Sequence, residues 1–363
     1  MTRTVGTGCQ GVGMTVELAQ LRMAAQRLIG ARCATPAEAV RWSTAVQGQD
    51  LPGALTSVAL RSVGGARAAV EAALDAGEVV RSWPMRGTLH LTAAEDLPWM
   101  LELLGPRALA GVEKRRAVVG ITEPELERAR ELVVTALGGG GRLSRPDLLA
   151  AIAAGGVPTA GQRGYHVLWY LAQTGTLVLG PTSAGDQQFV LLEEWVPSPR
   201  RLEREEALGE LARRFFASHG PATVQDLVRW AGVLVRDART GLALAAPQLE
   251  RLVVEGTEHW LDPATPDRLA AARAEADGVH LLPGFDELVL GYADRSCTVP
   301  AEFADRIVPG NNGVFRPTAV HRGRVVGVWR VGRGKARPIE LDPFTELPAA
   351  VLAAVQERYA ELP

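Results

Sequence analysis

A chain of 363 residues is long enough for two or three domains, each large enough to bury its own core. Hydrophobic residues make up 47% and charged residues 22%, close to ordinary globular usage, which excludes a disordered or fibrous protein. The formal net charge of −2 argues against a protein that coats nucleic acid over its whole surface, although recognition needs only a local basic surface.

The apolar runs and the cysteines further restrict the class of protein to which this sequence can belong. Charges, Gly or Pro interrupt every apolar run before the ~18 residues that a membrane span requires. The three cysteines, Cys9, Cys33 and Cys297, form no CxxC pair, which is typical of reduced thiols and not of a zinc site or a disulfide framework. We therefore expect a cytoplasmic protein with no membrane contact, no metal and no cofactor.

The first third of the chain is predicted to form helices that end in a short hairpin. Residues 1–14 are expected to be a disordered lead. Helices are expected over 16–29, from the cap Thr35-Pro36 to about Gln47, over 51–63 and over 66–76. Residues 78–92 are rich in β-formers, which favours a two-stranded wing. Helices followed by such a hairpin are typical of a winged-helix module.

The same order of elements returns twice. The second round is helix 122–137, a helix capped by Ser144, helix 160–174, and strands 176–179 and 188–196. The third round is helix 201–218, a helix capped by Thr223, helix 235–245 and a hairpin over 252–261. The repetition lies in element order and not in residue identity. We therefore predict winged-helix modules at 15–120, 121–198 and 199–276.

After Asp277 the composition changes to short β-like stretches between glycine and proline turns. They span 279–282, 288–292, 315–320, 324–331 and 337–341. An amphipathic helix over 347–362 is expected to pack across them. The fold class is therefore predicted to be α+β, with tandem winged-helix modules and a C-terminal β-rich unit over 277–363.

Basic residues gather in one segment that contains no Asp or Glu. From residue 306 to 337 there are eight of them, with His321 beside them: Arg306, Arg316, Arg322, Arg324, Arg330, Arg333, Lys335 and Arg337. A hairpin turning near His321-Arg322-Gly323 would present these charges to DNA phosphates. The alternative is a solvated hairpin whose arginines pair with acids from elsewhere in the fold. Arg86 and His90 lie in the first wing, where DNA contact and wing packing are equally favoured.

Common catalytic signatures are missing, since there is no phosphate-binding glycine loop, no HExxH and no GxSxG. Gln47-Gly48-Gln49 is a different kind of candidate, because its glycine favours an extended backbone in which residues i and i+2 share a face. Two amide oxygens can then hold one water. Asp50 is a carboxylate candidate, but it should face away. The other interpretation of the triplet is an ordinary polar helix C-terminus.

Residues 46–50, Val-Gln-Gly-Gln-Asp, resemble the QxQ motif of the AlkZ family of bacterial DNA glycosylases. Further segments similar to that family follow in the same order, at 84–91, 281–286 with Asp294-Arg295, 312–318 and 323–329. The resemblance covers nearly the whole chain from about residue 18. It implies a tandem winged-helix protein shaped as a C around duplex DNA, with Gln47 and Gln49 as the catalytic pair. The family usually has an aliphatic residue where this chain has Gly48.

The resemblance implies excision of bulky N7-alkylated purines, including interstrand crosslinks made by natural-product alkylators. A branch of the family carries Asp at the second glutamine position, so Gln49 places this chain nearer the self-resistance type. Alkylation at N7 makes the purine cationic, and it leaves as a neutral base without a general acid. Glutamine oxygens can then position a water and stabilise positive charge on the sugar as acceptors, although they cannot take up a proton.

We therefore expect a monofunctional DNA glycosylase whose partner is double-stranded DNA carrying alkylated purines. It would associate with the nucleoid when bound, without an obligate protein partner. Asp286 is expected to be a buried structural acid paired with Arg295, and a catalytic role is the alternative for it. The main alternative is a non-enzymatic winged-helix DNA-binding protein, either a transcription regulator or a drug-sequestering resistance protein. A winged-helix scaffold for protein interactions is a third hypothesis.

Overall fold

The computed structural model describes residues 2–4, 11–183, 186–335 and 337–363. They form two compact units, a central unit of residues 68–207 and a terminal unit of residues 1–67 with 208–363. Both ends of the chain therefore build one unit. The two units are divided at other residues than the four consecutive domains expected from the sequence. The boundaries of those four domains rest on the order of elements and stay a prediction.

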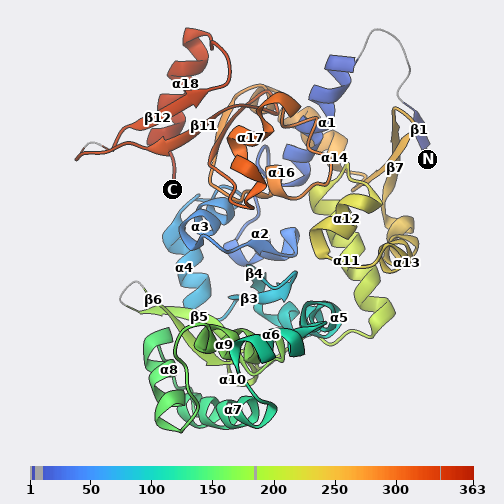
Figure 1. Cartoon of the computed structure of the whole chain (residues 1–363). Coiled ribbons are helices and arrows are strands. Elements are labelled where there is room, and N and C mark those ends of the chain that lie inside the picture. Colours follow the sequence, from blue (N-terminus) through green and yellow to red (C-terminus); the bar gives the residue numbers. More distant parts are fainter. Residues whose placement is uncertain (1, 5–10, 184–185, 336) are drawn as a thin grey trace. The chain divides into compact units, whose positions relative to one another are not determined.

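The central unit is an antiparallel sheet with helices on both faces (Figure 1). Strands β4, β3, β5 and β6 lie in this order. Its elements are α4 (Arg67–Asp75), β3 (Val79–Met85), β4 (Thr88–Ala93), α5 (Leu97–Leu109), α6 (Val112–Val119), α7 (Glu123–Leu137), α8 (Arg145–Ala154), α9 (Gln162–Gln173), β5 (Leu177–Ser183), β6 (Asp186–Leu191) and α10 (Leu192–Trp195). Successive strand residues face opposite sides, so Leu177 and Leu179 pack with α7–α9, and Val178 packs with α5 and α10.

The terminal unit contains helices and two separate sheets, β1-β7-β8 and β12-β11-β10-β9. Its elements are β1 (Thr2–Thr4), α1 (Gly11–Ala25), α2 (Pro36–Ser43), β2 (Val46–Gln47), α3 (Leu51–Ala59), α11 (Arg204–His219), α12 (Val224–Ala231), α13 (Val235–Ala245), β7 (Glu250–Val254), β8 (Thr257–Leu261), α14 (Thr265–Ala271), α15 (Arg273–Ala276), β9 (Val279–Leu282), α16 (Glu287–Leu290), α17 (Ala304–Ile307), β10 (Thr318–His321), β11 (Arg324–Val331), β12 (Ile339–Pro343) and α18 (Ala349–Ala360).

The four-stranded sheet of the terminal unit is covered on both faces. Leu281 and Ala319 pack against Val351 and Val355 of α18, which confirms that the terminal helix lies across this sheet. Leu282 and the apolar residues Val320, Val325 and Val328 face a second core with α1 and α14. The strands around β9 therefore lie between the terminal helix on one face and α1 with α14 on the other.

Several helices begin at the caps that the sequence predicts. The hydroxyls of Thr35, Ser144 and Thr223 accept hydrogen bonds from the backbone N–H three residues later. Such a cap stabilises a helix by about 1 kcal/mol. The cap at Thr35 fixes where α2 starts, and with it the approach to Gln47.

Two expected elements are different in the structure. Residues 288–292 were predicted to be β-like, but Glu287–Leu290 forms the short helix α16, because the Asp286 carboxylate accepts from the backbone N–H of Leu288. The expected disordered lead contains β1, which pairs in parallel with β7, and the first residues of α1.

None of the described helices is long and apolar enough to span a bilayer.

Candidate active site

Gln47 lies in a short extended segment directly after α2. The helix ends at Ser43, where Thr44 takes a left-handed φ of 68°, and Val46–Gln47 then form β2. The predicted extended backbone is confirmed at Gln47 but not through Gln49, because the chain bends at residues 49–50, and the helix ends earlier than expected and before Gly48. The Gln47 side chain is buried at 6% exposure, whereas Gln49 is exposed.

The side-chain oxygen of Gln47 is a buried acceptor. Among the described residues, no hydrogen-bond partner is found for Oε1, and solvent does not reach it. Leaving a polar atom in this condition costs about 1–3 kcal/mol, and an ordered water, an ion or a ligand is the usual partner of such an atom. A ligand atom or water that donates to Oε1 would recover this free energy.

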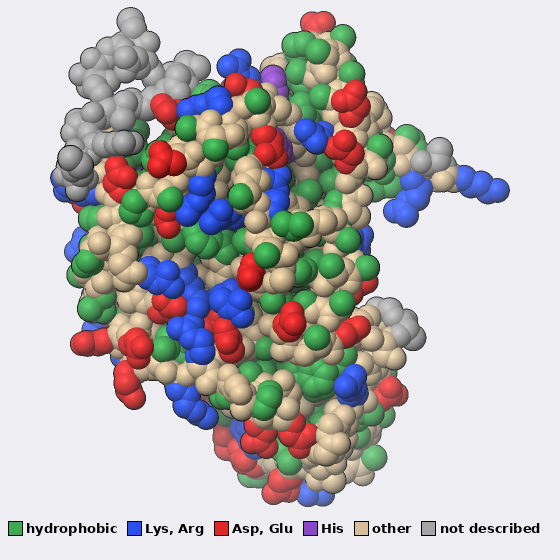
Figure 2. Space-filling model, turned by 180° about the vertical axis from the view of Figure 1, so that it is seen from behind, with side chains coloured by type: hydrophobic (Ala, Val, Ile, Leu, Met, Phe, Trp, Pro, Cys, Tyr) green, Lys and Arg blue, Asp and Glu red, His purple; other side chains and the backbone are tan. Residues whose placement is uncertain are grey.

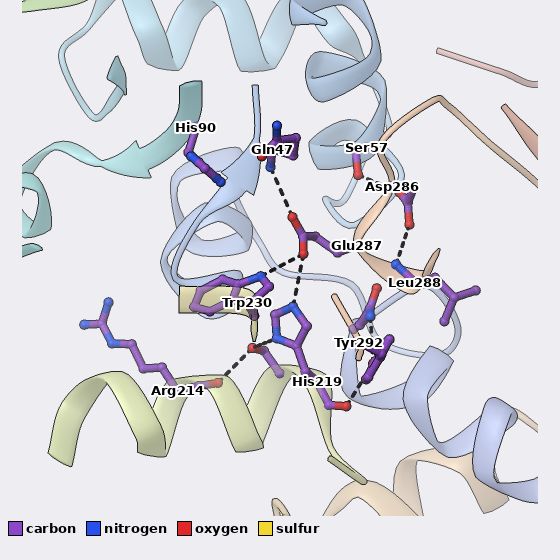
Figure 3. Close-up of polar contacts among 12 residues, drawn as sticks. Gln47, Ser57, His90, Arg214, His219, Trp230, Asp286, Glu287, Leu288 and Tyr292 are labelled. Carbon is purple, nitrogen blue, oxygen red and sulfur yellow. Dashed lines mark hydrogen bonds and ion pairs between the residues drawn. The ribbon is translucent and has the colours of Figure 1, made fainter. Parts of the chain in front are cut away.

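Glu287 holds the backbone of Gln47 in place. One carboxylate oxygen, Oε1, accepts from the backbone N–H of Gln47 at 3.1 Å. The other, Oε2, accepts from the indole Nε1–H of Trp230 at 3.0 Å. Glu287 is itself buried at 2% exposure, and Figure 3 shows it between Gln47, Trp230 and His219. Glu287, the first residue of α16, therefore fixes β2, the strand that carries the candidate catalytic side chain of Gln47.

His219 completes this buried cluster. The Ser218 hydroxyl donates to the carbonyl of Arg214, which leaves its oxygen to accept from Nδ1–H of His219, both at 2.8 Å. Nε2 then faces Glu287 Oε2 at 3.4 Å, a contact that is attractive only with a proton between the two atoms. A Cβ at Gly291 would lie 2.8 Å from Cδ2 of His219, so the ring can take this position only because residue 291 is glycine.

Asp286 is buried and paired as expected, but the prediction that Arg295 is its partner is wrong. Its carboxylate binds the guanidinium of Arg61 through two hydrogen bonds of 2.9 Å and accepts from the Ser57 hydroxyl at 2.6 Å. Burial raises the pKa of Asp286, but the Arg61 charge and these hydrogen bonds outweigh it and leave that pKa below its ordinary value. Asp286 is therefore an anchor between α3 and the loop before α16.

The same arginine begins a chain of buried hydrogen bonds. Arg61 donates to Oε1 of Gln26, and Nε2 of Gln26 donates to the Tyr292 hydroxyl. That hydroxyl donates to the carbonyl of His219 at 2.8 Å. The network connects α1, α3, α11 and the 286–292 segment, so every buried polar group named here has a partner.

Arg86 and His90, the two residues of the first wing that were predicted to contact DNA, differ in their exposure to solvent. Arg86 is exposed at the turn between β3 and β4. His90 is fully buried, with Nδ1 against the Thr88 carbonyl at 2.8 Å and Nε2 3.1 Å from Arg86. Nδ1 donates to that carbonyl, so Nε2 accepts from Arg86. This geometry favours wing packing for His90, which was one of the two alternatives.

The predicted basic hairpin turns at His321-Arg322-Gly323, as expected, but this turn does not project. His321, Arg322 and Arg324 line a cavity of about 820 Å³ together with α1 residues that include Glu17. The Arg322 guanidinium lies 3.5 Å from the Asp277 carboxylate. Burial, with the charge of Arg322, lowers the pKa of His321. This turn is therefore part of the packing around α1.

The projecting element is the next connection, between β11 and β12 (Figures 1 and 2). Arg333, Lys335 and Arg337 are exposed there, and within the described parts of the chain their side chains form no ion pair or hydrogen bond. The Tyr359 hydroxyl of α18 donates to the Arg337 carbonyl at 2.8 Å and holds the base of the hairpin. We call residues 332–335 and 337 the hairpin tip.

Other basic residues of the segment have carboxylate partners. Arg330 pairs with Glu340 and Arg306 pairs with Asp342, each at 2.6 Å. Arg316 is exposed and donates to the Arg306 carbonyl at 3.4 Å. For Arg306, Arg322 and Arg330 the structure therefore favours the alternative, in which β12 and residue 277 supply acids from outside the acid-free segment.

Sequence reasoning missed Glu287, His219 and Trp230. The adjacent acids Asp286-Glu287 after a predicted strand were a signal, but only Asp286 was considered. His219 and Trp230 are brought to Glu287 by α11 and α12, whose packing the sequence does not reveal. Within the described ranges, no group of three His, Cys, Asp or Glu residues has the arrangement of a metal site.

Comparisons with known proteins agree with this picture. The family model described as "DNA glycosylase AlkZ-like" matches residues 40–362. An "Interstrand DNA cross-link repair glycosylase" from Streptomyces sahachiroi is 26% identical over 330 residues, which cover 87% of each chain. The solved structure of the Streptomyces sahachiroi DNA glycosylase AlkZ superimposes with a TM-score of 0.79 at 24% identity, over 96% of this chain and 95% of that one.

Proposed function

Because the chain belongs to the AlkZ-like DNA glycosylase family, we propose that it hydrolyses the N-glycosidic bonds of bulky N7-alkylated purines in duplex DNA, including interstrand crosslinks. The curated relative that it resembles is a cross-link repair glycosylase, and each chain is covered over most of its length. The observation that carries the proposal is the buried, unpartnered Oε1 of Gln47 in an extended segment held by Glu287.

In this proposal Gln47 and Gln49 act as hydrogen-bond acceptors. Their oxygens orient a water toward the anomeric carbon and stabilise the positive charge that develops on the sugar. The alkylated base leaves as a neutral purine, so no general acid is required, and unmodified purines are poor substrates. Because Glu287 fixes the Gln47 backbone, the acceptor is oriented before the substrate arrives.

We also propose that the helices and hairpins form tandem winged-helix modules. Support comes from the order of elements in α7–α9 with β5 and β6, and again in α11–α13 with β7 and β8. Both series place three helices before a two-stranded hairpin, which is the order of a winged helix. A protein of this kind that only binds DNA is the alternative function, and it would not require a buried acceptor at residue 47.

The test of the proposed function is base release from defined lesions. Purified protein is incubated with duplexes that carry an N7-alkylguanine or an interstrand crosslink, and abasic sites are counted after mild alkali. We expect release from both substrates, none from unmodified duplex, and the same rates with EDTA, since the acceptors are neutral amides. Tight binding without abasic sites would support the non-enzymatic alternative, and a loss of activity in EDTA that a divalent metal restores would contradict this mechanism.

The hairpin tip is proposed to bind DNA phosphates. Replacing Arg333, Lys335 and Arg337 with Ala should weaken binding to any duplex, because these charges have no partner in the described structure. Each phosphate contact that is lost should reduce the log–log salt slope by about 0.9. Equilibrium binding at several salt concentrations measures this slope.

A matched control removes the same net charge from residues that already have partners. Arg128, Arg201 and Arg236 are exposed and lie within 4 Å of Glu131, Glu102 and Asp237. The triple Ala variant of these residues should keep most of the wild-type slope. An equal change in both triple variants would show that only total charge matters, and it would contradict a specific role for the tip.

A further inference from the structure

Arg295 has no counter-charge among the residues that the structure describes. Its Nε is shielded from solvent and lacks a hydrogen-bond partner, and no carboxylate pairs with its guanidinium. Asp286, the acid expected beside it, is bound by Arg61. Burial together with the charge of Arg229 lowers the pKa of Arg295 to about 10. An anion beside Arg295 would offset the cost of burying part of this cation.

A second arginine adds to the same positive field. Arg229 of α12 is exposed, and it too has neither an ion pair nor a hydrogen bond within the described ranges. The charge of Arg229 opposes the ionised form of Arg295, and residues perturbed in this way are candidates for functional sites. An anion bound by Arg295 would offset both this repulsion and the burial of Arg295.

An aromatic pair lies next to Arg295. Its Cζ is 5.0 Å from the ring centroid of Phe315, and the Phe315 and Phe285 centroids are 5.9 Å apart. This contact requires Gly284, since a Cβ there would lie 2.6 Å from the Phe315 carbonyl oxygen. Phe285 has a φ of 62°, which is unusual for a bulky residue. The buried Asp286–Arg61 pair holds this strained loop, so the aromatic pair is a fixed platform.

Both arginines are tied to the candidate active site through adjacent residues. Arg229 precedes Trp230, which donates to Glu287, and Glu287 accepts from the backbone of Gln47. Phe285 lies two residues before the same Glu287 in the loop. Arg229 is therefore next to a residue that holds Gln47 in place, and Arg295 reaches the same loop through the Phe315–Phe285 contact.

We propose that Arg229 and Arg295, beside the Phe285–Phe315 pair, form a binding site for one backbone phosphate of DNA. That the phosphate belongs to DNA rests on the proposed function, whereas the need for an anion rests on the unpaired Arg295 beside Phe315. Guanidinium groups bind phosphate oxygens in a bidentate manner. A phosphate held here fixes the register of the strand relative to Gln47, so Arg229 and Arg295 are positioning residues.

The first experiment measures binding of undamaged duplex, so its outcome does not depend on base release. Arg295→Met and Arg229→Ala should each weaken binding roughly tenfold or more and reduce the salt slope by about 0.9. Arg295→Lys should recover part of the affinity. Without DNA, Arg295→Met should melt at the wild-type temperature or above it, since an unpaired buried charge has been removed. Arg358→Met is the control, because Arg358 of α18 already pairs with Glu361, the residue that follows this helix.

The second experiment identifies the phosphate. In a duplex with one abasic-site analogue, each phosphodiester near the site is replaced in turn by a neutral methylphosphonate. At one position, the methylphosphonate should weaken binding by the wild type. The same replacement should not weaken binding by Arg295→Met any further, because that variant already lacks the contact. If Arg295→Met and Arg229→Ala both bind undamaged duplex with the affinity and salt slope of the wild type, the proposal is wrong. If inorganic phosphate raises the melting temperature of the wild type alone and duplex binding is unchanged in Arg295→Met, the site takes free phosphate and the DNA assignment is overturned.

Discussion

Replacing Gln47 with Ala should reduce the single-turnover rate of base release by about 10²–10³-fold, the usual cost of removing one preorganised hydrogen-bonding group from a transition state. Affinity for the alkylated duplex should remain nearly unchanged, since a buried neutral side chain is not expected to bind a phosphate. Gln49→Ala should reduce the rate as well. Rate and dissociation constant are measured on the same preparations, which separates loss of catalysis from loss of binding.

The matched control for this prediction is Gln356→Ala, because Gln356 is an exposed glutamine on α18. It should leave both the rate and the affinity unchanged. Wild-type rates in both Gln47→Ala and Gln49→Ala would remove these residues from the mechanism. Equal losses of rate and melting temperature in Gln47→Ala would instead assign this residue to folding.

Asp286→Asn should lower the free energy of unfolding by about 3–5 kcal/mol, because it leaves the buried guanidinium of Arg61 without its counter-charge. Asp342→Asn provides the comparison, since it breaks a pair of the same type with Arg306 in which the acid is 66% exposed. That variant should lose less than about 1 kcal/mol. Urea unfolding at neutral pH measures both, and similar losses would contradict the role given to Asp286.

The pH dependence of this effect has a definite sign. The pKa of Asp286 is lower in the folded protein than its ordinary value. Its ionised form therefore contributes stability that is complete above the ordinary carboxyl pKa and is lost as the pH falls through the folded pKa. The difference in unfolding free energy between wild type and Asp286→Asn should shrink in acid. A difference that stays constant in acid would contradict the ionised pair.

Local features were predictable because they depend on residues close together in the chain. Thr35, Ser144 and Thr223 cap helices as their side chains require, and the hairpins lie where β-formers surround turn residues. The extended backbone at Gln47 was also predicted. In contrast, the α16 helix was missed, because its start depends on the Asp286 side chain and not on the β-propensity of its residues.

The identity of a charge partner could not be predicted from nearby residues. The sequence suggested Arg295 for Asp286 because the two are close along the chain. Arg61, 225 residues away, is the true partner, since α3 packs against the 283–286 loop. The acid-free stretch correctly marked a basic hairpin, but it concealed the acids of β12 that pair with Arg306 and Arg330.

The sequence alone therefore determined the family resemblance, the helix caps, the extended glutamine segment and the clustering of basic residues, because each is a property of neighbouring residues. Tertiary structure decided which of these groups are buried and which partners they have. Glu287 reaches the backbone of Gln47 across 240 residues of chain, and the Asp286–Arg61 pair leaves Arg295 unpaired. Burial and long-range pairing arise only when distant segments pack, and they separate the catalytic, structural and phosphate-binding roles proposed for these side chains.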